Sequence, residues 1–363
     1  DKFSAFNGKN FSDEILKRSI AKALEEAGRS AFLSPKISRH LKRKIQRGKI
    51  RVLVSLPFPD SKGRIITQNF SRKNFKEKIS AREENKISEE VLDRTRADVS
   101  GFAKINSENK EKKLDWTCLK IISRKIDGYQ VPSLLGYDGK EVEFKILSVF
   151  SDADYSANIK SILKSFGLKF LGVIHLSETL GALLNGKSES KEILFIDVGG
   201  KTTEFFSASK GFLEGIGAIN TGGKMFTEIL SKDLNIDESS AVSLKEKYSK
   251  KMLTPESEIK INKIFQQSGK EWYSELSDKV KELTKKDIFY FDIYIFGGAG
   301  ELPEIKRVIE TELEEEAEKS ATSIRNKVNV IYPKDLEYIK DISESLSSPQ
   351  FVPALLVSSY LLD

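Results

Sequence analysis

The chain contains one segment whose residue types and order can bind a phosphate group. The segment is Asp197-Val198-Gly199-Gly200-Lys201-Thr202-Thr203-Glu204. Two glycines in a tight turn between strands let backbone amides approach an anion closely, where a Cβ atom would block the approach. The hydroxyls of Thr202 and Thr203 can add donors, and Asp197 can hold Mg²⁺ or orient a water molecule. An ordinary β-hairpin is the alternative interpretation of this segment taken alone.

Two further glycine turns follow later in the chain. Gly222-Gly223 precedes a predicted helix, and Gly297-Gly298-Ala299-Gly300 joins a buried strand to a helix that begins at Pro303. Proline is favoured in the first turn of a helix. A glycine turn at such a place lets a flat ring or a phosphate lie against the backbone, near the positive end of the helix. Each turn is weak evidence by itself, because many α/β proteins have one without a ligand.

The hydrophobic pattern predicts the elements that must position these turns. Predicted strands span residues 50–56, 119–126, 129–134, 141–150, 169–174, 192–206 (interrupted by the glycine turn), 212–219, 289–296 and 329–332. Predicted helices span residues 12–26, 156–166, 177–184, 224–230, 237–251, 257–285, 303–320 and 353–362, with helix and loop between 69 and 109. Asp127-Gly128 is a pair typical of a two-residue hairpin turn. The pattern therefore predicts an α/β protein.

Composition excludes several classes of protein. The chain has 363 residues, 39% of them hydrophobic and 31% charged, which fits a globular protein of two or more lobes. The net charge of +6 is too modest for this length to argue for nucleic acid. The single cysteine excludes an internal disulfide, favours a reducing compartment and, with only two histidines, disfavours zinc. No stretch approaches the roughly 20 apolar residues of a membrane span.

The order and separation of the three turns resemble the actin-like ATPase superfamily, which includes actin, heat-shock chaperones and sugar kinases. In that family a hairpin of the pattern Asp-x-Gly-Gly-x-Thr-x-acid holds the β- and γ-phosphates, as 197–204 would here. A later Gly-Gly-x-x-x-x-Pro loop contacts adenosine, and a Gly-Gly turn between the two opens the helix that borders the nucleotide. The resemblance implies a two-lobed, ribonuclease H-like α/β fold that binds ATP and Mg²⁺.

The same resemblance implies roles for individual residues. Asp197 would be the metal ligand and a catalytic residue, and Glu178, on a segment that resembles the connecting helix, would face the metal site as a second catalytic acid. Lys245 stands where some relatives have the lysine of an Ala-Glu-x-x-Lys motif that contacts the ribose and base. The implied nucleotide-binding residues are Gly199, Gly200, Lys201, Thr202, Thr203, Gly222, Gly223, Lys245, Gly297, Gly298, Ala299 and Gly300.

Within the superfamily the chain resembles the FtsA family of bacterial division proteins and the related PilM family of type IV pilus assembly. Both insert a small α+β (SHS2-type) subdomain ahead of the connecting helix, and residues 126–143 and 158–173 resemble its strands and helix. The implied divisions are 1–70, a partial first lobe; 71–174, the inserted subdomain; 175–192, the connecting helix; 193–236, the phosphate hairpin of the second lobe; 237–286, its helical subdomain; 287–347, the adenosine loop; and 348–363, the closing helix.

Three departures from the family pattern bear on catalysis. The family's first phosphate hairpin, Asp-x-Gly-Ser/Thr near the N-terminus, is not found, and residues 1–8 are too few to supply it, so the chain is either a fragment or degenerate there. Lys201 replaces a third glycine, where it can either add charge to the phosphate or crowd the loop. Ala241-Val242-Ser243-Leu244-Lys245 keeps the lysine of its motif and loses the glutamate. We therefore expect nucleotide binding with at most slow hydrolysis.

The resemblance implies a cytoplasmic scaffold at the inner face of the cell membrane. It would bind the tubulin-like division protein FtsZ, self-associate into filaments and contact the membrane only indirectly, with its partner surface on the helices from 237 to 285 and no role for nucleic acid. The alternative is a PilM-like adaptor of pilus assembly that captures a peptide from a membrane protein. A kinase on the same fold is disfavoured, because the first lobe offers no obvious substrate-binding base.

Two charged segments have both a functional and an ordinary interpretation. Residues 36–51 include eight basic residues and no acidic ones, and could meet anionic lipid or an acidic partner. Residues 310–318 include six glutamates and could be a docking site. A solvated helix face is the favoured interpretation of both. Trp116 and Trp272 are predicted to be packing residues.

Overall fold

The computed structural model describes residues 51–105, 114–184, 192–320, 326–339, 341 and 345–360, together with five isolated positions before residue 51. Four of those positions, 18, 21, 22 and 25, are helical and fall inside the predicted helix at 12–26. The rest of that helix, most of the basic segment 36–51 and the place of the family's first phosphate hairpin lie outside the described residues.

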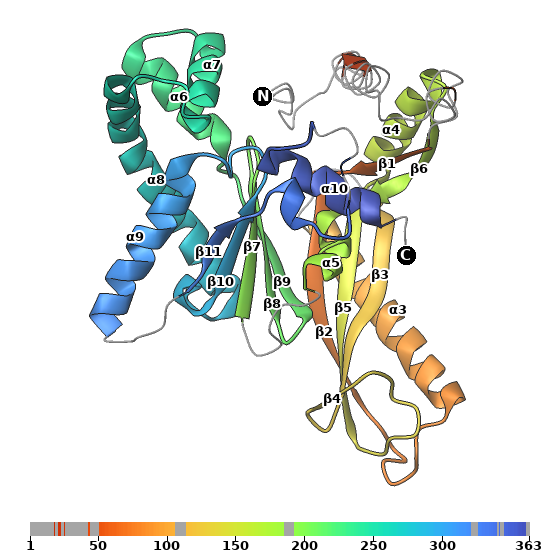
Figure 1. The fold of residues 1–363 in the computed structure, drawn as a ribbon. Coiled ribbons are helices and arrows are strands. Elements are labelled where there is room, and N and C mark those ends of the chain that lie inside the picture. The colour runs from red at the N-terminus through yellow and green to blue at the C-terminus, as the bar shows by residue number, and fades with distance from the viewer. Residues whose placement is uncertain are drawn as a thin grey trace.

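The chain forms two lobes, with helices α6 to α9 and a twisted sheet on one side and a second group of strands on the other (Figure 1). The sheet of the second lobe has the strand order β11-β10-β7-β8-β9, with β7, β10 and β11 parallel and β8 antiparallel to both neighbours. Its strands are β7 (Glu192–Val198), β8 (Thr203–Ser209), β9 (Phe212–Ile219), β10 (Asp292–Phe296) and β11 (Val328–Val330). Its helices are α6 (Gly223–Leu234), α7 (Glu238–Ser249), α8 (Pro255–Thr284) and α9 (Pro303–Ser320).

The core of the second lobe fixes helix α8 against the sheet. Phe265, Trp272 and Leu276 of α8 are fully buried, at spacings of seven and four residues that place them on one helix face. Phe226 of α6 packs edge-on against Phe265, with ring centroids 5.0 Å apart. Because each large apolar side chain stabilises by about 1.5–3 kcal/mol when buried, this face anchors α8 near the hairpin strands β7 and β8. The predicted packing role of Trp272 is confirmed.

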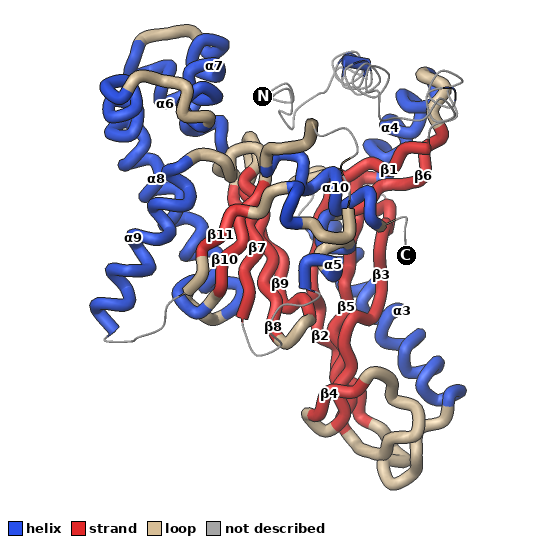
Figure 2. The backbone as a smooth tube through the Cα atoms, viewed as in Figure 1, coloured by secondary structure: helices blue, strands red, loops and turns tan. Residues whose placement is uncertain are grey.

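The first lobe holds a long antiparallel sheet in the order β2-β5-β3-β4 and a parallel pair, β1 and β6. Its strands are β1 (Arg51–Ser55), β2 (Ser61–Ser71), β3 (Leu114–Ile126), β4 (Tyr129–Val131), β5 (Glu141–Asp152) and β6 (Lys169–Ile174). Its helices are α3 (Ala81–Ile105), α4 (Ala153–Ser165), α5 (Gly181–Leu184) and α10 (Val352–Ser359). The sheet runs from the junction of the lobes to the far tip of the lobe, with α3 along it (Figure 2).

Strand β2 is the element that the sequence pattern does not predict. It pairs with β5 along its whole length, from Ser61 opposite Ser151 to Ser71 opposite Glu141. Its few apolar residues are only partly buried, because β2 is an edge strand of its sheet in the described part of the chain. The predicted start of the inserted subdomain at residue 71 therefore divides a sheet that already begins at Ser61.

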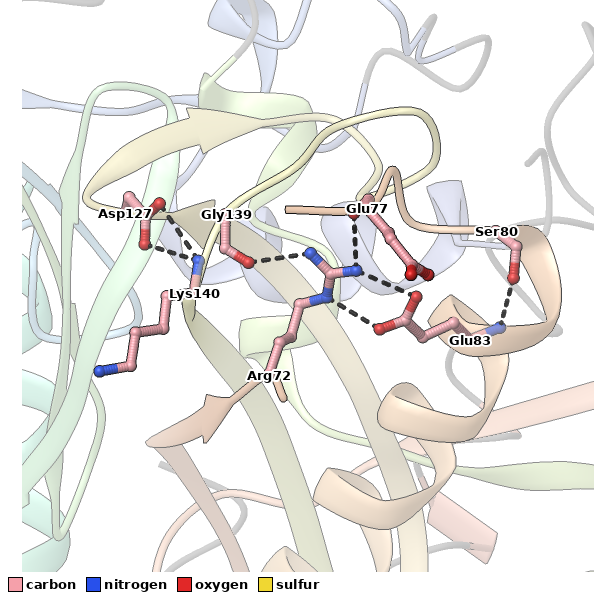
Figure 3. A network of polar contacts seen from close by, with 7 residues as sticks. All are labelled: Arg72, Glu77, Ser80, Glu83, Asp127, Gly139 and Lys140. Carbon is pink, nitrogen blue, oxygen red and sulfur yellow. Dashed lines mark hydrogen bonds and ion pairs between the residues drawn. The ribbon is translucent and has the colours of Figure 1, made fainter. Parts of the chain in front are cut away.

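A buried arginine holds together the far tip of this sheet (Figure 3). The guanidinium of Arg72 donates to the carbonyl of Gly139 at 2.8 Å, to the carbonyl of Glu77 at 3.0 Å and to both carboxylate oxygens of Glu83. The Asp127 carboxylate accepts from the amides that start β5. Asp127 and Gly128 have φ values of 47° and 87°, which confirms the predicted two-residue turn. The Arg72 side chain thus joins the loop before α3, the first turn of α3 and the loop at Gly139, and the Asp127 carboxylate joins its own turn to the start of β5.

The two lobes share an apolar cluster at their junction. It includes Leu180 before α5, Leu356 of α10, Phe195 of β7 and Val149 of β5. The predicted helix at 177–184 is two shorter pieces, a 3₁₀ turn at Leu176–Glu178 and α5. No helix among the described residues is long and apolar enough to cross a membrane.

Candidate functional site

The predicted phosphate hairpin connects β7 to β8 and rests directly on the start of α6. The loop closes through a hydrogen bond from the Gly199 amide to the Thr202 carbonyl at 3.0 Å. The amides of Gly223 and Lys224, which begin α6, donate to the carbonyls of Gly199 and Gly200 at 2.9 and 2.6 Å. These first amides of α6 are therefore used by the hairpin. Within the described part of the chain, the amides of Gly200 and Thr202 have no acceptor, so they are the donors that an anion would meet.

The third glycine turn also touches the hairpin. The amide of Ala299 donates to the carbonyl of Val198 at 2.8 Å. Gly297 has a φ of 92°, and a Cβ atom there would lie 2.1 Å from Asp197 Oδ1. Only glycine allows this approach, because both the backbone conformation and the space exclude a side chain.

The middle turn, Gly222-Gly223, lies between the other two. A Cβ atom at Gly222 would lie 2.7 Å from the carbonyl oxygen of Gly199, and one at Gly223 would lie 2.7 Å from the Cβ of Ala299. The three turns, separated by up to a hundred residues in sequence, therefore pack backbone against backbone, with Gly222, Gly223 and Gly297 buried in the contact. The glycines that remain open to a ligand are Gly199 and Gly200, which are partly exposed, and Gly298, which is exposed.

Asp197 lies at the end of β7, directly opposite Glu204 in the ladder with β8. Burial, and then the charge of Glu204, raise its pKa from 3.8 to about 7. The described residues include no cluster of three or more acidic, histidine or cysteine side chains suited to a metal ion. Mg²⁺ commonly takes one or two carboxylates, substrate phosphates and water. Asp197, at the end of β7 beside the predicted phosphate cradle, fits that habit.

The structure places Glu178 next to the junction of the lobes, where its carboxylate caps a turn. Glu178 Oε1 accepts from the backbone amide of His175 at 2.9 Å. Burial raises the pKa of Glu178, and hydrogen bonds from His175 and Cys118 act in the opposite direction. Its contacts give Glu178 a structural role, and its predicted role at the metal stays a prediction.

Thr203 has a different role from the predicted phosphate contact. Its side chain is fully buried, and its hydroxyl donates to the carbonyl of Thr221 at 2.7 Å. The same oxygen accepts from Nε1 of Trp272 at 3.0 Å. Because its hydroxyl makes both of these hydrogen bonds inside the protein, Thr203 stabilises the hairpin and does not face a phosphate. The side-chain hydroxyl that can face a phosphate is that of Thr202, which is partly exposed.

Lys245 of α7 reaches the start of α6 as a buried amine. Its Nζ donates to the carbonyl of Gly223 at 2.8 Å and to Oγ1 of Thr227 at 2.7 Å. Burial lowers its pKa to about 8, with Glu246 acting in the opposite direction. Lys245 thus lies beside the Gly222-Gly223 turn, and its predicted contact with the ribose and base stays a prediction.

Two charged residues that the sequence analysis did not predict, Lys224 and Asp60, act electrostatically on Lys201 of the hairpin. Burial and the neighbouring Lys224 lower the pKa of Lys201, and Asp60 acts in the opposite direction. Asp60 lies in the turn between β1 and β2, so a first-lobe carboxylate acts on a second-lobe lysine. In the sequence Asp60 is only an acidic residue after Pro59, and that pattern is too common to indicate a functional site.

Comparisons with known proteins found similarity to one protein family and to solved structures. The sequence model of the family described as Cell division protein FtsA matches residues 194–355. The structure is similar to one titled PilM-PilN type IV pilus biogenesis complex, with a TM-score of 0.61 and 15% identity over 94% of this chain and 85% of that chain. Ethanolamine utilization protein EutJ from Carboxydothermus hydrogenoformans gives a TM-score of 0.39 at 16% identity, over 55% of this chain and 59% of that one. No curated protein sequence matches the chain.

The two lobes and the adjoining glycine turns define an actin-like ATPase fold, which confirms the predicted α/β class. Within that class, the family match and the similarity in fold support a member of the FtsA/PilM type. Together they support an actin-like nucleotide-binding protein.

Proposed function

We propose that this chain binds ATP with Mg²⁺ between its lobes and acts as a scaffold of the FtsA type. The observation that carries the proposal is the contact of the three glycine turns around the hairpin. In the described part of the chain, the hairpin amides of Gly200 and Thr202 have no protein acceptor and can donate to a phosphate. A cradle of this kind holds phosphates through backbone donors. Mg²⁺, when bound, would neutralise phosphate charge, and Asp197 would hold it directly or through water.

The other site residues divide by what they touch. Thr202 and Lys201 would contact the phosphates, and the exposed backbone of Gly298 would form the wall against adenosine, held in place by the buried Gly297 and Gly300. Lys245 of α7, whose amine lies at the start of α6, would contact the ribose or base. Because Glu178 caps a turn and Lys201 replaces the family's third glycine, we expect hydrolysis to be slow relative to binding.

A fluorescence titration with a labelled ATP tests the binding. The wild-type chain should bind in the presence of Mg²⁺, and Asp197→Ala should bind at least tenfold more weakly, as expected for loss of a charged metal contact. Asp233→Ala is the matched control, because Asp233 is an exposed acid on α6. If the wild-type and Asp197→Ala chains both fail to bind ATP, the proposal is wrong.

For the partner we propose the division role first: binding of the tubulin-like protein FtsZ at the inner face of the membrane, with nucleotide-dependent self-association into filaments. The match of the FtsA family to the second lobe supports it. The helical subdomain also exposes two apolar side chains, Met252 (67%) and Ile259 (70%), among basic residues (Lys250, Lys251, Lys260) and acidic ones (Glu256, Glu258). Exposed apolar side chains of this kind can contact a partner protein.

The alternative is an adaptor of the PilM type, supported by similarity in fold over most of the chain. Such a protein would hold a nucleotide and capture a peptide from a membrane partner. Binding assays with FtsZ and with a cytoplasmic PilN-type peptide distinguish the two roles. Sedimentation of the chain with and without ATP tests the filaments.

A further inference from the structure

A buried histidine of the first lobe makes a hydrogen bond to the phosphate hairpin of the second. His175 follows β6 and is 1% exposed, and Glu204 of β8 is 5% exposed. His175 Nε2 lies 3.0 Å from Glu204 Oε1. The two residues are 29 positions apart, and the bond crosses the junction of the lobes, beside the shared apolar cluster.

The surroundings of His175 fix which ring nitrogen carries the proton. The backbone amide of Ser177 points to Nδ1 at 3.3 Å, in the capping arrangement that starts the 3₁₀ turn. A backbone N–H can only donate, so Nδ1 is the acceptor and Nε2 carries the hydrogen. The Ser177 hydroxyl, 2.8 Å from Nδ1, can donate to the same atom. The imidazole therefore donates from Nε2 to the Glu204 carboxylate.

This donor matters because Glu204 stands opposite Asp197 in the β7–β8 ladder. Residues opposite each other in a ladder have side chains on the same sheet face, and like charges there repel. His175 gives the Glu204 carboxylate a fixed partner on the first-lobe side. Phe206, on the same strand as Glu204, packs edge-on against the imidazole at 6.1 Å, so the ring has little freedom to turn away.

The other side of the imidazole rests on strand β2. A Cβ atom at Gly63 would lie 3.0 Å from Cε1 and 3.1 Å from Nδ1 of His175. The missing side chain at Gly63 is what lets the ring lie against the β2 backbone. His175 thus touches the hairpin strand with one edge and β2 with the other, and β2 continues to the far tip of the first lobe (Figure 1).

We propose that His175 is a positioning residue that transmits the state of the phosphate hairpin to strand β2 through its hydrogen bond to Glu204. The proposal rests on nucleotide binding at the hairpin, as proposed above. When phosphates order the hairpin, Glu204 and the imidazole are held with it, and β2 is held by the ring. The first lobe then responds to nucleotide through one hydrogen bond and one ring contact.

Hydrogen exchange of the full chain, with and without Mg-ATP, tests this transmission. In the wild type, ATP should slow amide exchange both in the hairpin, 198–204, and in β2, 61–71, by about tenfold in β2, a typical size for coupling between sites. His175→Phe keeps a ring and removes the donor, so the hairpin should still be protected while β2 responds less than twofold. His175→Gln restores a donor near Nε2 and should restore the response of β2.

Two further variants separate transmission from general damage. Lys145→Gln removes the ion pair between Lys145 of β5 and Glu214 of β9, another contact between the lobes, and should leave the β2 response intact. Gly63→Ala leaves the His175 side chain in place but crowds the ring from the β2 side, so the ring must shift and the response should weaken. It also serves as the test if His175→Phe does not fold.

The outcomes distinguish this inference from the proposed function. An unprotected hairpin in the wild type overturns nucleotide binding, and this inference with it. A protected hairpin with no response in β2, or a β2 response equal in the wild type and His175→Phe, overturns only the role of His175. Failure of His175→Gln to restore the response overturns transmission through the hydrogen bond to Glu204.

Discussion

The substitution Asp197→Asn should stabilise the protein at the same time as it weakens nucleotide binding. Burial and the facing charge of Glu204 raise the pKa of Asp197 from 3.8 to about 7. Ionising this group in the folded protein is therefore unfavourable, whereas in the unfolded chain it ionises near its ordinary value. Asparagine has nearly the same shape and never carries the charge.

The size and sign of the effect follow from linkage. Stability from the raised pKa is fully present below pH 3.8, declines as the pH rises and is lost once the pH passes about 7. At 1.36 kcal/mol for each pH unit between these values, the loss is on the order of 4 kcal/mol. Asp197→Asn escapes that loss, so its advantage over the wild type should grow from pH 5 to pH 7 and then level off.

Urea denaturation of both chains between pH 5 and pH 8 measures this directly. Asp233→Asn, on the exposed face of α6, is the control and should change the free energy of unfolding by less than about 0.5 kcal/mol. The reasoning is refuted if Asp197→Asn is less stable than the wild type at pH 8, or if the difference between them does not change with pH.

Four further substitutions have defined outcomes. Lys201→Gly restores the family's third glycine, and we expect faster phosphate release from ATP with less change in affinity, measured by single-turnover assay; an unchanged rate would contradict the crowding argument. Lys245→Met removes the amine that bonds Gly223 and should weaken ATP binding about tenfold in calorimetry without loss of fold. Trp272→Phe removes the donor to Thr203 and should lower the free energy of unfolding by about 1–3 kcal/mol in urea. Arg72→Met leaves Glu83 and two carbonyls without their donor and should speed proteolysis at the tip of the first lobe, with a cost of about 1–3 kcal/mol.

The sequence predicted the glycine turns well, because their residue types are set by local geometry. A positive φ at Gly297 and a close approach at Gly222 leave no choice but glycine, so the requirement is visible in the chain itself. The long, periodic helices and the buried strands of the second lobe were predictable for a similar reason. Their apolar residues repeat with the period of the element that buries them.

What could not be predicted depends on partners far apart in the chain. The residue type of Thr203 suggested a phosphate contact. In the fold its side chain is buried and its hydroxyl is hydrogen-bonded to Trp272, 69 residues later, so the hydroxyl does not face a phosphate. The hydrogen bond from His175 to Glu204 joins the two lobes, and the sequence around either residue gives no indication that they are partners. Strand β2 was not predicted because an edge strand shows little apolar alternation. The effect of Asp60 on Lys201 arises only when the two lobes come together in the fold.

The most direct test of the central claim, that the adjoining glycine turns form a nucleotide site, is calorimetric titration of Mg-ATP into the chain and one variant. A Cβ atom at Gly223 would lie 2.7 Å from the Cβ of Ala299, whereas one at Gly181 would have no neighbour within 4 Å. We predict binding to the wild type and to Gly181→Ala, and at least tenfold weaker binding to Gly223→Ala. No heat of binding with the wild type, or equal affinity in all three chains, would contradict the claim.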